Sequence, residues 1–134
     1  MEPRIVLANG VFDILHVGHL YYLEAAAKMG DHLCVSVTRD QFVNKGIGRP
    51  VNTEADRARL VGGIWCVNRV ILCNNAIEAL DLIKPDIFVK GKDYIGKIED
   101  IHRDYCAAHK IKIAFTDTPI YSATKIINDR LRTS

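Results

Sequence analysis

Residues 10–19 read Gly-Val-Phe-Asp-Ile-Leu-His-Val-Gly-His, and they follow a short apolar run, residues 4–9, that we predict to be a buried strand. The small residues of this stretch predict a tight turn from that strand into a helix. Such a turn brings free backbone N–H groups and the positive end of the helix dipole to one point, which favours a bound phosphate. His16 and His19 are three positions apart and therefore share one face of the helix. The stretch predicts a phosphate-binding site with two imidazole rings over it.

The rest of the chain alternates short apolar runs with longer amphipathic segments, which is typical of a doubly wound parallel sheet. We predict strands at residues 4–9, 32–38, 68–73, 86–90 and 111–115. We predict helices at residues 17–29, 53–66, 76–83, 98–109 and 123–132, with Gly30 as the C-cap of the first. Right-handed crossovers place the first strand centrally, and ligands gather where the strand order reverses. The predicted fold class is α/β, a five-stranded parallel sheet in a single domain that spans residues 1–134.

The composition is that of an ordinary globular domain, with 49% hydrophobic and 25% charged residues in a chain of 134. A net charge of +2 is too small to indicate nucleic acid or an anionic membrane as a partner. No apolar run is long enough to cross a bilayer, and residues 1–9 lack the apolar stretch of a signal peptide. The cysteines form no Cys-x-x-Cys pair and lie in apolar segments, so we expect buried free thiols and a cytoplasmic location. They are Cys34, Cys66, Cys73 and Cys106.

The pattern Gly10-x-Phe12-Asp13-x-x-His16-x-Gly18-His19 resembles the signature of the HxGH nucleotidyltransferases, the cytidylyltransferase-like superfamily. The resemblance implies a Rossmann-like fold and a nucleotidyl transfer to a small phosphorylated acceptor, with Mg²⁺ carried by the nucleoside triphosphate. It assigns His16 and His19 to the α-phosphate and the transition state, and Gly18 to close approach of the phosphate to the backbone. The alternatives are a solvent-facing pair of surface histidines and a zinc site. Zinc lacks a third ligand here, and zinc helices usually space their histidines i,i+4.

The residues between the strand and the histidines are also expected to take part. Val11 and Phe12 are expected to contact the nucleotide through their backbone at the end of the first strand. Asp13 is the nearest carboxylate, and its role stays open among holding magnesium through water, binding the acceptor, and ordering the loop or capping the helix.

Residues 44–52, Asn-Lys-Gly-Ile-Gly-Arg-Pro-Val-Asn, form a basic, glycine-bearing loop after the second predicted strand, and such loops often act as lids. Together with Arg57 they resemble the matching stretch of the bacterial heptose 1-phosphate adenylyltransferases. The resemblance gives Lys45 a catalytic role in contact with the acceptor phosphate and places Arg57 near the nucleotide. Without the resemblance, Lys45 would be a solvated loop charge and Arg57 a helix-surface residue.

Residues 89–94, Val-Lys-Gly-Lys-Asp-Tyr, follow the fourth predicted strand and resemble an element of the same sugar-phosphate branch. The resemblance assigns Gly91 to the nucleotide and Asp93 to the nucleotide or the acceptor, and Lys90 is expected to bind the acceptor through its phosphate. On the residues alone, Lys90 is a polar cap of a strand and Asp93 a turn residue.

Residues 121–126, Tyr-Ser-Ala-Thr-Lys-Ile, open the last predicted helix and resemble the family's second signature, Ser-Thr-Thr before a helix. The resemblance assigns Ser122 and Thr124 to the β- and γ-phosphates, whereas spacing alone makes Ser122 an N-cap. Ala123 replaces the middle threonine. Asp117 stands where glycerol-3-phosphate cytidylyltransferases carry an arginine that grips the nucleotide.

The leading prediction is an enzyme that transfers AMP from ATP to a sugar 1-phosphate, such as a heptose phosphate, and releases pyrophosphate. The alternative is a cytidylyltransferase that uses CTP with glycerol 3-phosphate, another polyol phosphate or a small phosphonate. An alternative of another class is a catalytically silent nucleotide sensor, which Ala123 and Asp117 motivate. The resemblance also implies a homodimer, and no nucleic-acid or membrane partner is expected.

Overall fold

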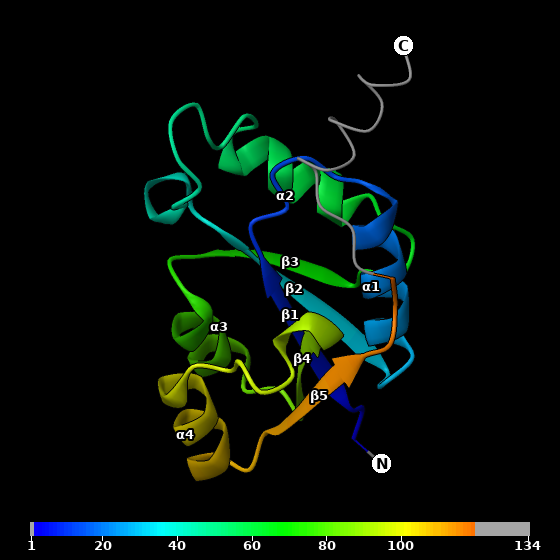
Figure 1. Ribbon diagram of the computed structural model, residues 1–134. Helices are drawn as coiled ribbons and strands as arrows, with labels where there is room; N and C mark the ends of the chain where they lie inside the picture. The colour runs from blue at the N-terminus through cyan, green and yellow to red at the C-terminus, as the bar shows by residue number, and fades with distance from the viewer. Residues whose placement is uncertain (1, 120–134) are drawn as a thin grey trace.

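The computed structural model describes residues 2–119 and shows parallel strands in one sheet with helices on both faces (Figure 1). The strands are β1 (Ile5–Gly10), β2 (His32–Thr38), β3 (Arg69–Cys73), β4 (Ile87–Gly91) and β5 (Lys112–Thr116). The helices are α1 (Val17–Ala27), α2 (Glu54–Gly62), α3 (Ala76–Ile83) and α4 (Asp100–Ala108), with 3₁₀ turns η1 (Asp40–Phe42) and η2 (Lys92–Tyr94). The predicted α/β fold class and its five strands are confirmed. The helix predicted at residues 123–132 lies outside the described residues.

The strand order is β3-β2-β1-β4-β5, so the first strand is central, as predicted. Ala8 of β1 pairs in register with Val35 on one side and Val89 on the other. The chain moves outward from β1 to β3 and then crosses back to β4, so the order reverses between β1 and β4. At such a reversal the connections leave toward opposite faces of the sheet, and the strands' carboxyl ends leave room for a ligand.

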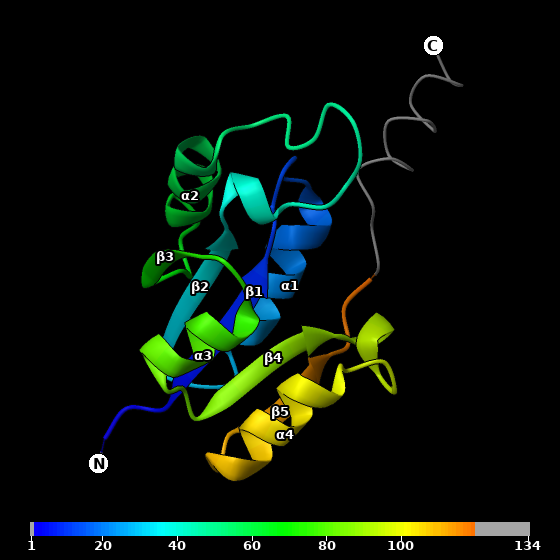
Figure 2. The ribbon, with the colours of Figure 1, turned by 90° about the vertical axis from the view of Figure 1, so that its left-hand side faces the viewer.

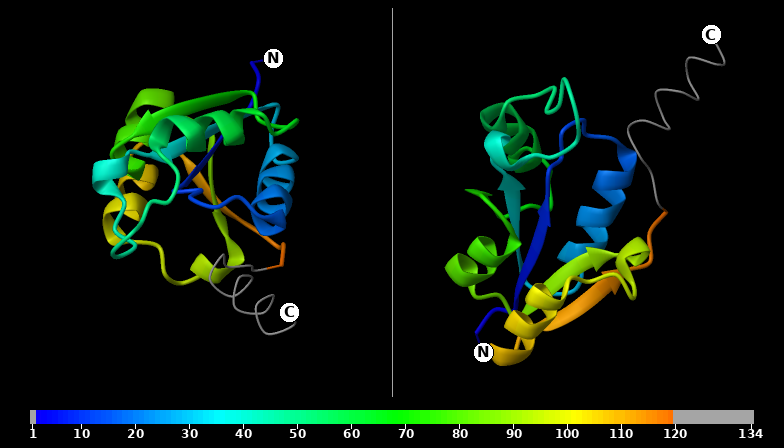
Figure 3. Two further views of the ribbon diagram at one scale, coloured as in Figure 1. Left: turned by 90° about the horizontal axis from the view of Figure 1, so that it is seen from above. Right: turned by 60° about the vertical axis from the view of Figure 1, so that its left-hand side comes forward.

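Each face of the sheet carries an apolar layer. Val6 and Ala8 pack with Leu23 of α1 and Val61 of α2, whereas Leu7 packs against α3 and α4. This alternation along β1 follows from the two-residue period of a strand, and burial on both faces explains the continuous apolar runs in the sequence. Figure 3 shows the sheet between α1 on one side and α3 with α4 on the other.

Gly30 has a different function from the predicted C-cap. The helix α1 ends at Ala27, and its C-cap is Lys28 in a right-handed helical conformation. A Cβ on Gly30 would lie 2.7 Å from both the Arg4 carbonyl oxygen and Cγ2 of Val6. Glycine is therefore required because this turn passes against the start of β1.

All four cysteines are buried free thiols, as predicted. Within residues 2–119, no helix has the length and apolar character needed to cross a membrane. Residues 43–53 connect η1 to α2 and arch beyond the carboxyl end of the sheet (Figure 2).

Candidate active site

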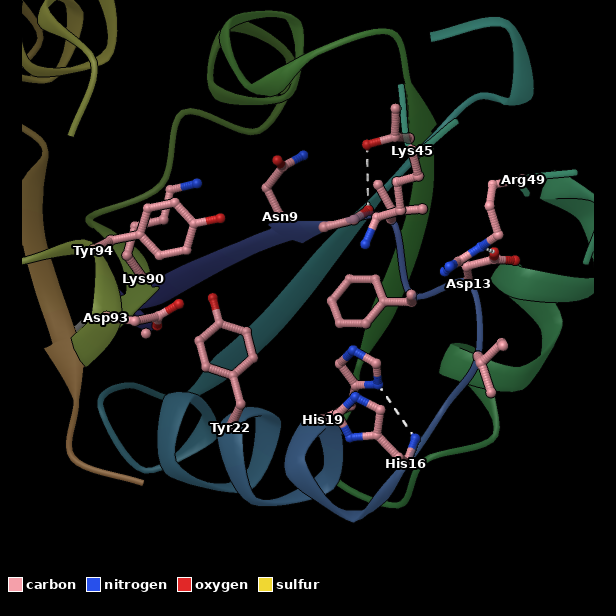
Figure 4. Close-up of a pocket in the computed structure, with 16 residues that line it drawn as sticks. Asn9, Asp13, His16, His19, Tyr22, Lys45, Arg49, Lys90, Asp93 and Tyr94 are labelled. Atoms are coloured by element: carbon pink, nitrogen blue, oxygen red, sulfur yellow. Dashed lines mark hydrogen bonds and ion pairs between the residues drawn. The ribbon is translucent and has the colours of Figure 1, made fainter. Parts of the chain in front are cut away.

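A cavity of about 510 Å³ opens at the carboxyl ends of β1 and β4, where the strand order reverses. Figure 4 shows side chains from the β1–α1 turn, the loop of residues 43–53 and the end of β4 meeting there. The lining residues are Asn9, Gly10, Val11, Phe12, Asp13, Ile14, His16, His19, Tyr22, Thr38, Lys45, Arg49, Lys90, Gly91, Asp93 and Tyr94. A smaller cavity of about 120 Å³ shares His16, His19 and Tyr22 and also contacts Gly18 and Thr118.

The two histidines begin α1 and cap its backbone. Nδ1 of His16 accepts a hydrogen bond from the Gly18 N–H at 3.1 Å, and Nδ1 of His19 accepts one from the His16 N–H at 3.3 Å. The rings are stacked with their centroids 3.8 Å apart. Because each Nδ1 is an acceptor, each neutral ring carries its proton on Nε2. The helix start therefore fixes one tautomer of both rings, with the proton of each neutral ring on Nε2.

Both rings are kept neutral. Burial, together with the nearby charges of His16 and Lys45, lowers the pKa of His19 to about 4. Burial and the Lys45 charge also lower the pKa of His16. Near pH 7 the pair therefore offers uncharged hydrogen-bond donors.

Phe12 supports His19 from the core. Its φ of 52° is rare for a bulky residue, and its ring is buried in the layer between the sheet and α1. The ring meets His19 edge-on with centroids 5.2 Å apart. A Cβ on Gly10 would lie 2.8 Å from the Phe12 ring, so Gly10 makes the space for this packing.

Asp13 orders the loop of residues 43–53. Its buried carboxylate accepts hydrogen bonds from Arg49 Nε at 2.5 Å, the Val51 N–H at 2.8 Å and the Asn52 N–H at 3.0 Å. Burial raises the pKa of Asp13, but these bonds and the Arg49 charge outweigh it and hold the pKa below its usual range. Of the roles left open by the sequence, the geometry supports loop ordering. The predicted acceptor contact stays a prediction, because Asp13 also lines the cavity.

Arg57 lies beneath the same loop and does not line the cavity. The side chain is fully buried, and it donates to the carbonyls of Val11 at 2.8 Å, Thr38 at 2.7 Å and Asn52 at 3.0 Å. It also pairs with Asp40 at 2.6 Å. This differs from the predicted nucleotide contact, because all three guanidinium nitrogens already have protein partners. Arg57 ties the ends of β1 and β2 to the loop.

Two lysines approach the cavity from different elements. Lys45 is exposed in the loop, close enough to the histidines to affect their pKa values. Nζ of Lys90, at the end of β4, lies 4.8 Å from the centroid of the Tyr94 ring and 5.2 Å from that of Phe88. Burial lowers the pKa of Lys90, although Glu99 and Asp93 oppose this effect. Within the described part of the chain, the Lys90 ammonium has no carboxylate at ion-pair distance and remains available to an anion.

Gly91 and Asp93 lie in the wall that the two cavities share. A Cβ on Gly91 would lie 2.5 Å from Asp93 Oδ1, so the glycine lets this carboxylate fold over the end of β4. Tyr22 of α1 closes the same wall, and its hydroxyl donates to the Val89 carbonyl at 2.9 Å. Burial, with smaller effects of Tyr94 and Asp93, raises the pKa of Tyr22.

The lining includes polar residues that are not among the predicted site residues, namely Asn9, Tyr22, Thr38, Arg49 and Tyr94. Two of them carry a signal in the sequence. Tyr22 follows His19 by three positions on the same helix face, and Asn9 is a polar residue at the end of an apolar strand. The predicted phosphate ligands Ser122 and Thr124 lie outside the described residues.

Residues 2–119 contain no cluster of three or more His, Cys, Asp or Glu side chains that would hold a metal ion. The Asp13 carboxylate already accepts three hydrogen bonds from the loop. Asp13 and Asp93 are the carboxylates in the lining, so this donor set fits an Mg²⁺ ion whose other ligands are triphosphate oxygens and water.

A doubly wound parallel sheet whose first strand runs into a histidine-capped helix defines a class of α/β proteins that bind phosphate at the first strand–helix turn. The chain belongs to the cytidylyltransferase-like family, whose model matches residues 7–129.

Curated relatives include proteins named "Bifunctional protein HldE". The protein from Campylobacter fetus subsp. fetus is 40% identical over 128 residues, covering 92% of this chain and 27% of that protein. The one from Nitratiruptor sp. is 46% identical over 98 residues, covering 70% of this chain and 21% of that protein. The chain thus spans about a fifth to a quarter of the length of these relatives.

Two solved structures share the fold. The lipopolysaccharide core biosynthesis protein from Thermoplasma volcanium GSS1 aligns with a TM-score of 0.74 at 31% identity, covering 89% of this chain and all of that one. A protein of unknown function from Archaeoglobus fulgidus aligns with a TM-score of 0.64 at 21% identity, covering 85% of this chain and 89% of that one.

Proposed function

We propose that residues 1–134 form a nucleotidyltransferase domain that transfers AMP from the magnesium complex of ATP to a sugar 1-phosphate, such as a heptose 1-phosphate, and releases pyrophosphate. The observation that carries this proposal is the stacked pair of neutral imidazoles at the start of α1, whose tautomers the helix backbone fixes. They line a cavity that also presents the cations of Lys45 and Lys90. Neutral donors stabilise charge on phosphate oxygens without themselves acting as an acid or base.

The reaction follows from this arrangement. A phosphate oxygen of the acceptor attacks the α-phosphorus in line, a new P–O bond forms, and the bond between the α-phosphorus and the bridging oxygen to the β-phosphate breaks. The bridging oxygen leaves with pyrophosphate. The histidines donate to the α-phosphate oxygens, where negative charge crowds in the transition state. A phosphate acceptor is already ionised at neutral pH, so the reaction needs no general base.

We place the two substrates in the two adjoining cavities. The smaller cavity, with Gly18, Gly91 and Asp93 in its wall, would hold only part of the nucleotide, which would cross into the larger cavity with its α-phosphate beside the backbone of Val11 and Phe12. The larger cavity suits the acceptor, with its phosphate between Lys45 and Lys90. The resemblance supplies Ser122 and Thr124 as ligands of the departing pyrophosphate.

The relatives named HldE and the family resemblance favour ATP with a sugar phosphate over the alternatives. Asp117, whose side chain is 98% exposed, stands where a glycerol-3-phosphate cytidylyltransferase has its nucleotide-binding arginine. This difference disfavours CTP with a polyol phosphate. A silent sensor would have no need of two tautomer-fixed histidines in the cavity.

A matrix of the four nucleoside triphosphates against phosphorylated acceptors tests the proposal, with pyrophosphate release as the readout. We expect turnover with ATP and a sugar 1-phosphate, dependence on Mg²⁺, and no turnover in the double variant His16→Asn/His19→Asn. Preferred use of CTP with glycerol 3-phosphate would support the alternative. Triphosphate binding by calorimetry with no pyrophosphate release from any pair would contradict an enzyme.

We also propose that the chain works as a homodimer in the cytoplasm. Four buried free thiols suit a reducing compartment. Trp65 is 77% exposed and donates to Glu24 of α1 at 3.1 Å, and Val17 and Tyr21 of the same helix are exposed as well. This apolar surface supports pairing. Light scattering should give twice the 15.0 kDa mass of one chain, and a monomer would contradict the pairing.

A further inference from the structure

Neighbouring strands of the sheet end in polar side chains on the face that α3 and α4 cover. On that face β2, β1 and β4 bury Cys34, Leu7 and Phe88. Two positions later on the same strands stand Ser36, Asn9 and Lys90. Strand alternation puts each on the same face as the apolar residue before it. The change from apolar to polar therefore occurs in three adjacent strands at the same level, at the carboxyl edge.

Asn9 is the best-defined member of this group. Its Nδ2 donates to the Ser36 hydroxyl at 2.7 Å, and Ser36 is fully buried. This bond fixes the amide plane in the cavity wall. Among residues 2–119, neither Oδ1 nor the second N–H of the Asn9 amide has a hydrogen-bond partner, and no buried side-chain polar atom is left unsatisfied. Both atoms are therefore available to a ligand.

Asn9 and the histidines line different parts of one cavity. Figure 4 shows Asn9 on the opposite side of β1 from His16, His19 and Tyr22. Lys90 and Tyr94 line the cavity as well. The cavity thus crosses the carboxyl edge of the sheet, and a ligand that reaches the histidines extends over this edge toward Asn9.

The chemistry beyond the edge suits hydroxyl groups. A fixed carboxamide offers one donor and one acceptor side by side, which matches a sugar hydroxyl or a pair of adjacent hydroxyls. Lys90 adds ammonium donors, and Tyr94 adds an aromatic ring against which the apolar face of a sugar packs. A phosphate alone uses the cations and leaves the Asn9 amide unused.

We infer that Asn9, oriented by Ser36, is a specificity-determining residue that hydrogen-bonds a hydroxyl of the acceptor, so the protein selects sugar phosphates over phosphates without hydroxyls. This inference rests on the proposed function and adds the group that recognises the sugar. A half-buried amide held in one orientation discriminates between acceptors, because a ligand without a hydroxyl covers its polar atoms and leaves them unpaired.

The test compares two acceptors that carry the same phosphate, the best sugar 1-phosphate from the matrix and ethyl phosphate. The measured quantity is the ratio of their kcat/KM values, the hydroxyl preference. We expect Asn9→Ala to lower this preference by about 10- to 100-fold, because the kcat/KM for the sugar phosphate falls. The kcat/KM for ethyl phosphate and the KM for ATP should change by less than about threefold.

Two further variants separate positioning from general damage. Ser36→Ala removes the hydroxyl that orients the amide and should lower the hydroxyl preference by a smaller factor, about 3- to 10-fold. Asn74→Ala is the matched control, because this asparagine follows β3 at the same edge but does not line the cavity, and its preference should equal that of the wild type. If Asn9→Ala does not fold, Asn9→Ser takes its place.

Equal losses for both acceptors in Asn9→Ala would overturn the inference, because they indicate a structural role. A raised KM for ATP with an intact hydroxyl preference would overturn it too, by assigning Asn9 to the nucleotide. If the wild type releases no pyrophosphate with any pair, the proposed function fails, and calorimetric Kd values for the same two acceptors then decide the inference. The inference is upheld if the wild type binds the sugar phosphate more tightly than ethyl phosphate and Asn9→Ala removes this difference. It is rejected if the wild type binds the two acceptors equally or binds neither.

Discussion

Nδ1 of His16 and Nδ1 of His19 both accept backbone N–H groups at the start of α1, while the two rings stack 3.8 Å apart. The same side chains therefore begin the helix and serve the site. If either ring were protonated, its Nδ1–H would point at a backbone N–H, and two donors would face each other. The capping geometry and the lowered pKa values thus favour the same neutral state.

Because His16 has two functions, one substitution can separate them. His16→Ala removes the cap and should cost about 1 kcal/mol of the free energy of unfolding. His16→Asn restores a side chain that caps helices well. Its free energy of unfolding should therefore exceed that of His16→Ala by about 1 kcal/mol. Both variants lose the Nε2–H donor, and both should lower kcat by about 10²- to 10³-fold. Urea unfolding and pyrophosphate release measure the two effects.

The role of His16 would be refuted by a His16→Asn protein that turns over at close to the normal rate. If His16→Ala is inactive and His16→Asn, which restores the cap, is active, the role of His16 is structural.

The lowered histidine pKa values predict a pH dependence of stability. Between pH 6.5 and about 4 the unfolded chain binds a proton on His19 that the folded protein excludes. Protonation therefore favours the unfolded state, and stability falls as the pH drops through 6.5 and levels off below about 4. Urea midpoints measured from pH 7.5 to 4.5 should decline less steeply in His19→Asn than in the wild type. An NMR titration of the His19 ring with a midpoint near 6.5 would disprove the shift.

Most of the fold could be predicted because its signals are local. Apolar runs gave the strands within one or two residues, and β2 was predicted with the same bounds that the structure has, His32–Thr38. The helix predicted at residues 53–66 ends at Gly62, since Gly63 caps it and a turn leads to β3. The predicted C-cap at Gly30 is wrong because close contact with Arg4 and Val6, 26 and 24 positions earlier, requires glycine there.

The site was predicted less completely because its contacts are long-range. Asp13 meets Arg49 and Asn52 across 36 and 39 positions, and no local pattern encodes such a pairing. Arg57 lies on a helix whose other charged residues are more exposed, so its complete burial depends on carbonyls from two strand ends. The hydrogen bonds that begin α1 join His16 to Gly18 and His19, and contacts this local could be predicted from the motif.

The Asp13–Arg49 pair predicts that loop order controls Lys45. Asp13→Asn keeps the shape of the side chain but removes the charge that Arg49 pairs with, so residues 43–53 should exchange amide hydrogens faster. The kcat/KM for the acceptor should fall by about 10-fold, with the KM for ATP unchanged. Lys45→Ala should affect the acceptor in the same way. Hydrogen exchange and steady-state kinetics measure both.

A double-mutant cycle shows whether Asp13 acts through Lys45. If it does, Asp13→Asn should cost almost nothing once Lys45 is alanine, because the loop no longer carries the functional cation. Fully additive losses in kcat/KM would mean that Asp13 contributes by another route.

Arg57 should behave as a structural residue. Lys cannot reproduce a planar guanidinium that bonds three carbonyls and Asp40, so Arg57→Lys leaves buried carbonyl groups unpaired. We expect this variant to lose about 3–5 kcal/mol of the free energy of unfolding. Under conditions in which Arg57→Lys is still folded, its KM for ATP should stay within about twofold of that of the wild type. A matched change on the exposed face of the same helix, Arg59→Lys, should leave stability within about 0.5 kcal/mol. A stable Arg57→Lys protein with a strongly raised KM for ATP would instead return this arginine to the nucleotide, because only a direct contact changes binding without changing the fold.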